Sequence, residues 1–547
     1  MALLELLLVL LLTAVALGWV ARHFKFPYPI ALLAGGMVLG LVPNLPAVAF
    51  DPQLILVVVL PPILYQAALL TSWTDFKASI RPIGLLAIGL VAATTLAVGA
   101  ALKWMVPDVP WAVAFVLGAI VSPPDAVAAT AILSRLNIPR RIVTILEGES
   151  LVNDASGLVL YKFAVAAVLT GTFSLGHATV QFINVSLGGI VVGVVLAYAY
   201  IAIHKRLGDP FIEVLTVLTI PYAAYLAAEA IHVSGVLAVV AAGLVRGRYA
   251  PEIVSAEMRI MARSVWNMLV FLLNSVVFML IGLQLPAVLD SLVSYPSTQL
   301  AAIGAVVTLV AVGVRFAWVY PAAWLPRVVS GSLRDEAQPG SRKGELAIIS
   351  WCGMRGIVSL AAALALPLTL ADGTPFPHRD LIIFLTFVVI LATLVGQGLT
   401  LAPLIRWFKV GSTWSLRDEQ IRVRAAMSAA ALAAIDTQLA LEGAPQEWAR
   451  HLKAEFEERI ALAAAEGGPL TPRLALDNRL RHAAIQAERD ELLRLWRGNE
   501  IGDEVMHHLM EALDYEQARL PALDAHADTV SVPAAATPGE PGPGRSG

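Results

Sequence analysis

The sequence predicts an all-α polytopic membrane protein, with about thirteen transmembrane helices followed by a helical cytoplasmic tail. Of the 547 residues, 58% are hydrophobic and only 14% are charged, whereas a soluble globular protein is about one quarter charged. Apolar runs of about twenty residues, each long enough to cross a bilayer as a helix, recur from Met1 to Phe408. The net charge of −3 is too small to favour a nucleic-acid partner, so the expected partner is the lipid bilayer.

The predicted spans follow one another with short polar loops between them. The first residues are as apolar as a signal peptide, but they lack a basic start and contain Glu5, so we expect a retained first span. Several spans contain Gly and Pro, which membrane helices tolerate. The expected limits are 2–20, 28–47, 52–70, 82–106, 111–134, 142–170, 179–203, 211–231, 233–248, 264–286, 298–325, 345–370 and 380–408.

Basic residues concentrate in alternate loops, and this alternation predicts the orientation in the membrane. The other loops and their borders carry only Lys103 and Arg379. Because basic loops stay in the cytoplasm, the N-terminus is expected outside and the C-terminus in the cytoplasm, in the cell (inner or cytoplasmic) membrane. The basic loop residues are Arg22, Lys25, Lys77, Arg81, Arg135, Arg140, Arg141, Lys205, Arg206, Arg246, Arg248, Arg259, Arg263, Arg327, Arg334, Arg342 and Lys343.

The composition changes after the last apolar run, which predicts three domains. Residues 1–410 would form the membrane domain, residues 411–521 a cytoplasmic helical tail and residues 522–547 a disordered C-terminus. The only cysteine, Cys352, excludes an intramolecular disulfide. The sequence has no Walker A loop, no zinc-ligand spacing and no nucleophile elbow, so we expect neither enzymatic activity nor a cofactor.

Three ionisable residues from different predicted spans lie near the middle of the membrane. Helix geometry places Asp154 about 18 Å from the inner surface, and Asp125 and Arg355 about 15 Å from it, in a hydrocarbon core of about 30 Å. A charge at this depth costs about 2.5–3.5 kcal/mol on insertion scales and marks an ion or proton pathway by default. The sequence therefore predicts a polar site near the midplane.

Two predicted spans are interrupted at the same depth. Pro123 and Pro124 remove two backbone donors from the fifth span, and Gly353 and Gly356 weaken the helix around Arg355 in the twelfth. Interrupted segments at corresponding positions of two halves indicate a transporter site. Spans one to six and eight to thirteen would then form two inverted repeats, with the interrupted helices crossing near the midplane. The alternative is that Pro and Gly are simply common in membrane helices.

The sixth predicted span carries oxygen donors of the kind that a small hard cation prefers. Ser150 and Asp154 are four residues apart and share one face of the helix, and Asn153 projects about 100° away from Asp154. Glu149 lies on the same face as Asn153. We expect Glu149 to form a structural ion pair with Arg355, because an unpaired arginine at this depth is hard to sustain.

Two other basic residues lie inside predicted spans. Arg315 belongs to the eleventh span, and Lys162 lies toward the outer end of the sixth, from which its side chain can reach the membrane surface. Both are expected to have structural roles.

Four motifs resemble those of the first cation/proton antiporter family, the bacterial and eukaryotic sodium/proton exchangers. The resemblance covers about residues 1–410 and implies a homodimer of thirteen-helix subunits, each with a dimerisation part and a mobile core. The motifs are LPPILYQAAL at 60–69, SPPDAVAA at 122–129, EGESLVNDA at 147–155 and GMRGIVSLAAALALP at 353–367.

The resemblance also implies roles for individual residues. The ion- and proton-binding residues would be Asp154, Asn153, Asp125 and Ser150. Asp154 would be the main carrier carboxylate, and Glu149 would pair with Arg355 beside it. Asn153 directly before Asp154 resembles the electroneutral branch of the family. No bound metal is implied beyond the transported alkali cation.

The implied function is secondary antiport of a monovalent cation, sodium before potassium or lithium, against protons, in pH and sodium homeostasis. The residues alone leave other classes open. A cation channel would need a continuous polar path, yet the intramembrane charges cluster at one depth. An organic-anion symporter with a similar inverted-repeat fold could direct helix N-termini at its substrate, but two aspartates at this level favour a cation. A sensor that signals through residues 411–547 is a further class.

Overall fold

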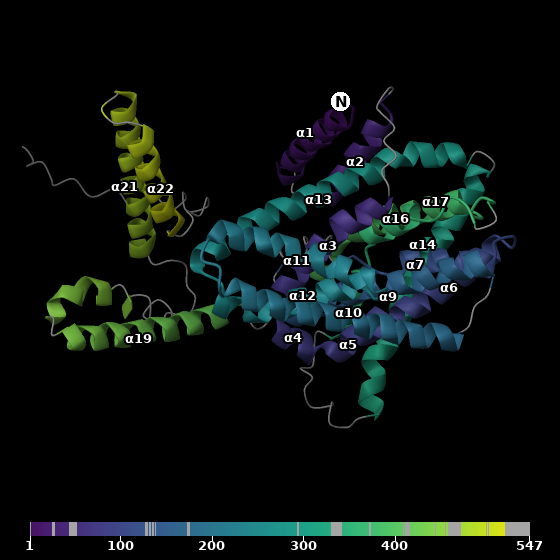
Figure 1. Cartoon of the computed structure of the whole chain (residues 1–547), viewed down its shortest axis with the longest axis horizontal. Helices are drawn as coiled ribbons and strands as arrows, with labels where there is room; N and C mark the ends of the chain where they lie inside the picture. The colour runs from purple at the N-terminus through teal and green to yellow at the C-terminus, as the bar shows by residue number, and fades with distance from the viewer. Residues whose placement is uncertain are drawn as a thin grey trace, which may run out of the picture. The chain divides into compact units, whose positions relative to one another are not determined.

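The structure, a computed structural model, is nearly all helical and divides into two compact units, Met1–Thr413 and Trp414–Gly547 (Figure 1). This agrees with the all-α class that the sequence predicts. The described residues are 2–23, 28–42, 52–125, 129–130, 133, 136, 138–171, 175–292, 295–329, 342–370, 373–408, 410, 416–442, 445–454, 456–457, 472–498, 500 and 503–519.

Helices of the first unit follow the apolar segments of the sequence. Among the described residues, seven helices are long and apolar enough to cross a membrane, by length and composition. The number of spans and the inverted repeats stay predictions. The elements are α1 (Ala2–His23), α2 (Tyr28–Gly40), α3 (Pro52–Leu70), α4 (Trp73–Ala78), α5 (Ile80–Gly84), η1 (Leu85–Leu90), α6 (Val91–Met105), α7 (Trp111–Val121), α9 (Arg140–Thr170), α10 (Leu175–His204), α11 (Pro210–Ala230), α12 (Gly235–Ile253), α13 (Ala256–Ser291), α14 (Ser297–Val329), α15 (Arg342–Trp351), α16 (Ile357–Leu364), α17 (Arg379–Ala392), η3 (Thr393–Gln397) and α18 (Gly398–Phe408).

Two of the predicted spans contain a π-helical turn that the sequence did not indicate. The span predicted at 82–106 includes η1, and the span predicted at 380–408 includes η3. A π turn shifts the backbone hydrogen-bond register and is frequent at functional sites. The carbonyl of Ala87 in η1 accepts a hydrogen bond from the Ser156 hydroxyl of α9. The π turn in η1 is thus bonded directly to the helix that carries the predicted site.

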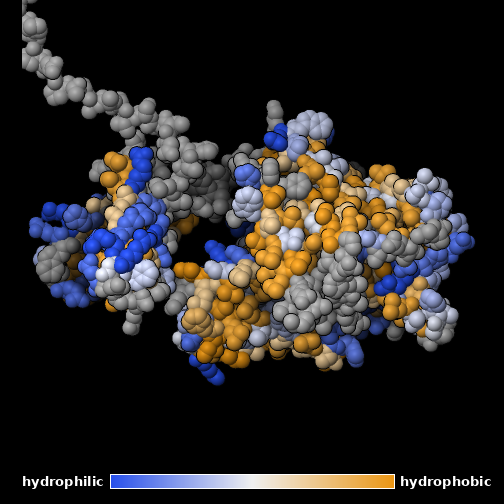
Figure 2. Space-filling model, turned by 90° about the horizontal axis from the view of Figure 1, so that it is seen from above, coloured by the Kyte–Doolittle hydropathy of each residue, from blue (hydrophilic) through white to orange (hydrophobic). Residues whose placement is uncertain are grey.

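Large apolar side chains cover much of the surface of the first unit (Figure 2). They come from several of the long helices, including Leu96 of α6, Val191 of α10 and Leu309 of α14, all of which are exposed. A monomeric soluble protein rarely exposes a contiguous apolar patch larger than a few hundred Å². This surface therefore suits contact with lipid.

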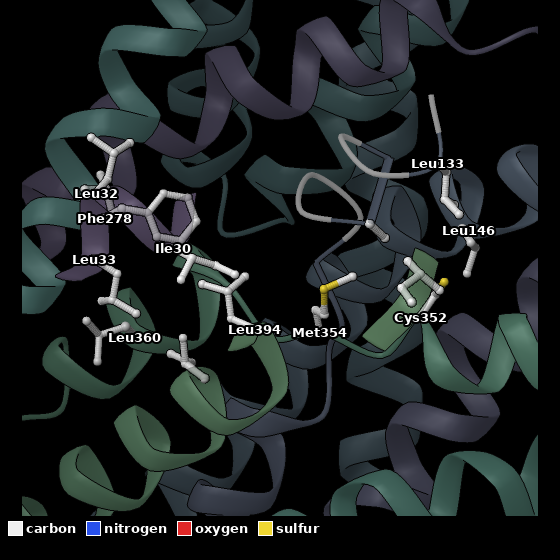
Figure 3. Close-up of a cluster of buried hydrophobic side chains, with 14 of the residues drawn as sticks. Ile30, Leu32, Leu33, Leu133, Leu146, Phe278, Cys352, Met354, Leu360 and Leu394 are labelled. Carbon is white, nitrogen blue, oxygen red and sulfur yellow. The ribbon is translucent and has the colours of Figure 1, made fainter. Parts of the chain in front are cut away.

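A buried apolar cluster attaches α2 and α13 to the interrupted helix pair α15 and α16 (Figure 3). Ile30 of α2 lies beside Phe278 of α13, and Met354, between α15 and α16, lies beside Leu394 of η3. Close packing gives each such side chain many dispersion contacts, each of about 0.1–0.2 kcal/mol. The cluster therefore fixes the non-helical backbone around Met354 against continuous helices.

The second unit is helical, and its helices lie within the range predicted for the cytoplasmic tail. An ion pair of 2.6 Å between Arg489 and Asp514 joins its last two helices. The disorder predicted for residues 522–547 lies outside the described residues. The elements of the unit are α19 (Leu416–Glu442), η4 (Gln446–Ala449), α21 (Pro472–Arg497) and α22 (Asp503–Arg519).

Helices α2 and α13 pack backbone against backbone through glycines. A Cβ atom at Gly36 would lie 2.2 Å from the carbonyl oxygen of Met279, and one at Gly282 would lie 2.3 Å from the carbonyl oxygen of Leu33. Neither backbone can move away without separating the helices. Small residues of this kind allow close helix packing in membranes, where the hydrophobic effect gives no driving force between helices.

We therefore expect Gly282→Val to destabilise the first unit, Met1–Thr413, which is the membrane unit. The added side chain overpacks a backbone contact, which typically costs about 1–3 kcal/mol. The thermal unfolding midpoint and the yield of monodisperse protein measure this effect. Gly313→Ala is the matched control, because a Cβ at Gly313 meets nothing within 4 Å. Equal midpoints for the two variants would contradict the packing described for α2 and α13.

Candidate ion-binding site

Helix α9 places the predicted acidic and amide residues in the interior of the membrane unit. The helix spans 31 residues and ends at Thr170, and Gly171 after it adopts a left-handed conformation with φ of 68°. Glu149, Asn153 and Asp154 are all buried. Ser150, which lies one turn before Asp154 on the same face, is half-buried.

The interruption predicted at the two prolines is present and lies against α9. Helix α7 ends at Val121, just before the prolines, which lack the N–H groups that a continued helix needs. The carbonyl of Pro124 accepts a hydrogen bond from Nδ2 of Asn153 at 3.0 Å. A Cβ at Gly157 would lie 3.0 Å from Cγ of Pro123, so the interruption packs directly on this glycine of α9.

The second predicted interruption is also present, and it touches the first. Helix α15 ends at Trp351 and α16 begins at Ile357. The backbone N–H of Asp125 donates to the carbonyl of Met354 at 2.7 Å. A Cβ at Gly356 would lie 1.7 Å from Oδ2 of Asp125, so only glycine permits this approach of the carboxylate. The two non-helical segments therefore cross in contact with each other.

Carboxylates from α9 and from the first interruption meet at this crossing. Asp154 and Asp125 are close enough for their charges to interact. Oδ1 of Asn153 is buried and has no hydrogen-bond partner among the described residues, while its amide nitrogen is bonded to Pro124. Two carboxylates that repel each other and a neutral amide oxygen can bind a hard monovalent cation or a proton. Within the described part of the chain, no group of three or more His, Cys, Asp and Glu side chains could hold a resident metal ion.

The structure corrects the predicted ion pair between Glu149 and Arg355. Glu149 pairs with Arg315 of α14, through Nη1 to Oε1 at 2.5 Å and Nη2 to Oε2 at 2.7 Å. Both side chains are 1% exposed, and Nε of Arg315 donates to the carbonyl of Ile349 at 3.0 Å. Two parallel charge-assisted bonds of this geometry are among the strongest in proteins.

Arg355 instead supports the ends of the interrupted helices. Its guanidinium donates to the carbonyl oxygens of Val121 at 2.9 Å, Ala311 at 3.5 Å and Gly353. Val121 is the last residue of α7, so a positive charge there satisfies unpaired carbonyls and the negative end of the helix dipole. The backbone N–H of Arg355 donates to Oγ1 of Thr393 in η3 at 3.1 Å. Arg355 thereby joins three helices at the crossing.

Depth along the helices could have indicated that Arg315 belongs to the site. It lies ten residues before the end of the span predicted at 298–325, about 15 Å deep, which is the level of the other charges. A depth gives no direction around the helix axis, however, so it could not choose between two arginines. Lys162, also predicted to be structural, forms a partly exposed ion pair with Glu229 at 3.1 Å.

The pairing leads to a stability prediction. Glu149→Leu leaves Arg315 buried without a counter-charge, and breaking a buried pair in this way costs about 3–5 kcal/mol. We expect a lower thermal unfolding midpoint and a lower yield. Adding Arg315→Met should recover part of the loss, whereas adding Arg355→Met should not.

The matched control for this stability prediction is Glu229→Gln. Its pair with Lys162 is partly exposed, and such pairs contribute at most about 1 kcal/mol. The assignment of Arg315 would be contradicted if both arginine substitutions rescued Glu149→Leu equally, or if Glu149→Leu unfolded at the wild-type temperature.

Comparison with known proteins identifies the family of the chain. A family model described as sodium/hydrogen exchanger, transmembrane, matches residues 8–407. An uncharacterized Na+/H+ exchanger of Mycobacterium tuberculosis is 34% identical over 525 residues, which cover 94% of this chain and 95% of the relative. A sodium, potassium, lithium and rubidium/H+ antiporter of Bacillus subtilis is 38% identical over 402 residues, which cover 71% of this chain and 60% of the relative.

A solved structure shares the fold. The sodium proton antiporter MjNhaP1 from Methanocaldococcus jannaschii matches with a TM-score of 0.58 at 20% sequence identity, over 74% of this chain and 98% of that chain. At this identity the likeness concerns the fold alone. Taken with the family match over most of the membrane unit, it leads to one conclusion: the chain belongs to the sodium/hydrogen exchanger family of membrane transporters.

Proposed function

We propose that this chain is a secondary antiporter that exchanges a monovalent cation, most directly sodium, for protons across the cytoplasmic membrane. The observation that carries the proposal is the buried carboxylate of Asp154, which lies next to Asp125 at the crossing of two interrupted helices. Beside it is the amide oxygen of Asn153, which has no hydrogen-bond partner in the part of the chain that the structure describes. Names of relatives support the choice of ions, since the Bacillus subtilis protein is named for sodium, potassium, lithium, rubidium and protons.

Exchange follows from competition for one carboxylate. An ionised Asp154 that has lost its hydration is expensive to carry through an apolar barrier. A proton or a cation on the same oxygens neutralises it, but the two cannot bind there together. A site that holds either a proton or a cation can therefore become accessible from the other side of the membrane, whereas the empty site cannot. This difference couples the proton flux to the cation flux.

The neighbours of Asp154 would supply the other oxygen ligands of the cation. Ser150, one helical turn away on the same face, and Asn153 would supply neutral oxygens, and Asp125 would supply the second carboxylate. Glu149 is neutralised by Arg315 and would remain a structural element of the site. One titrating carrier with an amide beside it favours exchange of one cation for one proton, which is electroneutral.

The architecture supports alternating access by movement of one part against another. We infer a homodimer whose subunits each have a dimerisation part and a mobile core, with α9 and the two interruptions in the core. The alternation of basic loops favours an orientation with the N-terminus outside and the C-terminal tail in the cytoplasm. A cation channel and an organic-anion symporter are less well supported, because two carboxylates meet at a single depth and the relatives are named as cation/proton exchangers.

Replacing the carrier carboxylate tests the proposal. Asp154→Asn cannot exchange a proton for a cation, so sodium-driven proton flux in proteoliposomes should fall to the level of empty vesicles while the protein stays folded. Asp108→Asn is the matched control, since Asp108 is an exposed aspartate in the loop before α7, and it should keep the wild-type rate. Undiminished exchange by Asp154→Asn would refute the assignment.

The stoichiometry has a separate test. If one cation exchanges for one proton, an imposed membrane voltage adds no driving force, and the rate of sodium-dependent proton flux should be unchanged by valinomycin-clamped potentials of either sign. Sodium, potassium and lithium compared in the same vesicles give the selectivity. Flux that accelerates with one sign of the voltage and slows with the other would contradict electroneutral exchange.

A further inference from the structure

Buried polar side chains also gather away from the candidate ion site, where α10, α11 and α12 pack against one another (Figure 1). His204 ends α10, Glu213 lies in the first turn of α11, and Arg246 belongs to α12. The His204 and Glu213 side chains are 1% and 10% exposed, and Arg246 is buried. The mechanism proposed for exchange uses none of these residues.

Tyr200 and Glu213 lie on opposite sides of the His204 ring. Nδ1 of His204 shares a hydrogen bond of 2.9 Å with the Tyr200 hydroxyl. Nε2 lies 3.7 Å from Oε2 of Glu213, which is within the range of an ion pair but too long for a hydrogen bond. Cζ of Arg246 lies 5.5 Å from the centre of the Tyr200 ring. The imidazole therefore has a carboxylate on one side, and a guanidinium lies beyond its tyrosine partner.

Several polar atoms of this cluster have complementary unmet bonds. Nε2 of His204, Oε2 of Glu213, and Nε and Nη2 of Arg246 are buried and have no hydrogen-bond partner among the described residues. Each unmet bond at a buried polar atom costs about 1–3 kcal/mol. The Glu213 oxygen accepts, whereas the guanidinium N–H groups donate, and so does Nε2 when it carries a proton. The donor that the structure places next to the Glu213 oxygen is Nε2 of His204, at 3.7 Å.

Two more polar side chains border the cluster from α3 and α13. The rings of Tyr65 and Trp266 lie 5.6 Å apart, and the Tyr65 hydroxyl and the indole nitrogen of Trp266 are buried without a partner among the described residues. Neither is charged at neutral pH. In the described surroundings of the His204 ring, the charges that act on it are therefore those of Glu213 and Arg246.

We propose that His204 and Glu213 form a second proton-binding site, separate from Asp154, in which protonation of His204 draws Glu213 into an ion pair across the 3.7 Å between them. When His204 takes up a proton from a hydronium ion, both ring nitrogens carry hydrogen, and Nε2–H becomes a charged donor that attracts Glu213. The N–H bond that forms replaces an O–H bond of the hydronium ion, and no other covalent bond forms or breaks.

Formation of this ion pair acts on the joint between α10 and α11. His204 is the last residue of α10 and Glu213 is in the first turn of α11, so a bond between them closes the connection at 205–209. The start of α11 is already fixed, because Asp209 accepts a hydrogen bond from the N–H of Phe211 at 2.8 Å. In the orientation that the proposed function assumes, this joint faces the cytoplasm, so cytoplasmic protons would act on the exchanger at a point away from Asp154.

Imidazole NMR of the histidine-labelled full-length protein in lipid nanodiscs tests the site between about pH 5 and pH 9, the range around an ordinary histidine. His204→Gln identifies the signal. We expect Glu213→Gln to lower its titration midpoint by about one pH unit or more, because the proton loses its counter-charge. Arg246→Met should raise the midpoint similarly, because it removes a charge that repels the protonated imidazole.

Controls separate these effects from a general disturbance. Arg246→Lys keeps the charge and should leave the midpoint near that of the wild type, and the signal of His232 should be unchanged in every variant. Absence of a His204 transition, or shifts of the same sign in the Glu213 and Arg246 variants, would overturn the proposal. If Arg246→Met does not fold, Glu213→Gln is sufficient by itself, since a His204 titration midpoint that does not fall in this variant contradicts the proposal. The measurement requires no transport, so its failure is distinguishable from a failure of the proposed exchange.

Discussion

Two interrupted helices can exist inside a bilayer only when the protein itself satisfies the backbone groups that the interruptions release. Here the two non-helical segments bond to each other, through the N–H of Asp125 and the carbonyl of Met354. Asn153 bonds to the carbonyl of Pro124, and Arg355 bonds to the carbonyl of Val121 at the end of α7. These hydrogen bonds at the two interruptions are the constraint on which the rest of the membrane unit depends.

The same contacts determine which charged side chains are available to bind a proton or a cation. Arg355 is occupied by carbonyl oxygens, and Arg315 is occupied by Glu149. Among the described residues, neither arginine is bonded to Asp154, so this carboxylate can bind a proton or a cation. An arginine paired with Asp154 would have made a stable but inert site. Separation of structural ion pairs from the carrier carboxylate is thus what the proposed exchange requires.

Much of this arrangement could be predicted from local sequence, because the relevant signals are local. Pro123 and Pro124 cannot continue a helix, and counting along a helix predicts that Asp125 and Asp154 lie at a similar depth. The partner of Glu149 could not be predicted, since that choice depends on how α9, α14 and the second interruption are turned about their axes. The π turns could not be predicted for a related reason, because they depend on tertiary hydrogen bonds such as that from Ser156 to the carbonyl of Ala87.

The proposed exchange depends on one carboxylate, that of Asp154, which binds either a proton or a cation. Proton release on cation binding measures this competition most directly. Sodium added to the purified protein in weakly buffered solution should release about one proton per subunit, since a cation that binds a protonated ligand displaces its proton. Asp154→Asn should release none under the same conditions. Sodium binding without proton release, or equal release from Asp154→Asn and the wild type, would contradict the central claim.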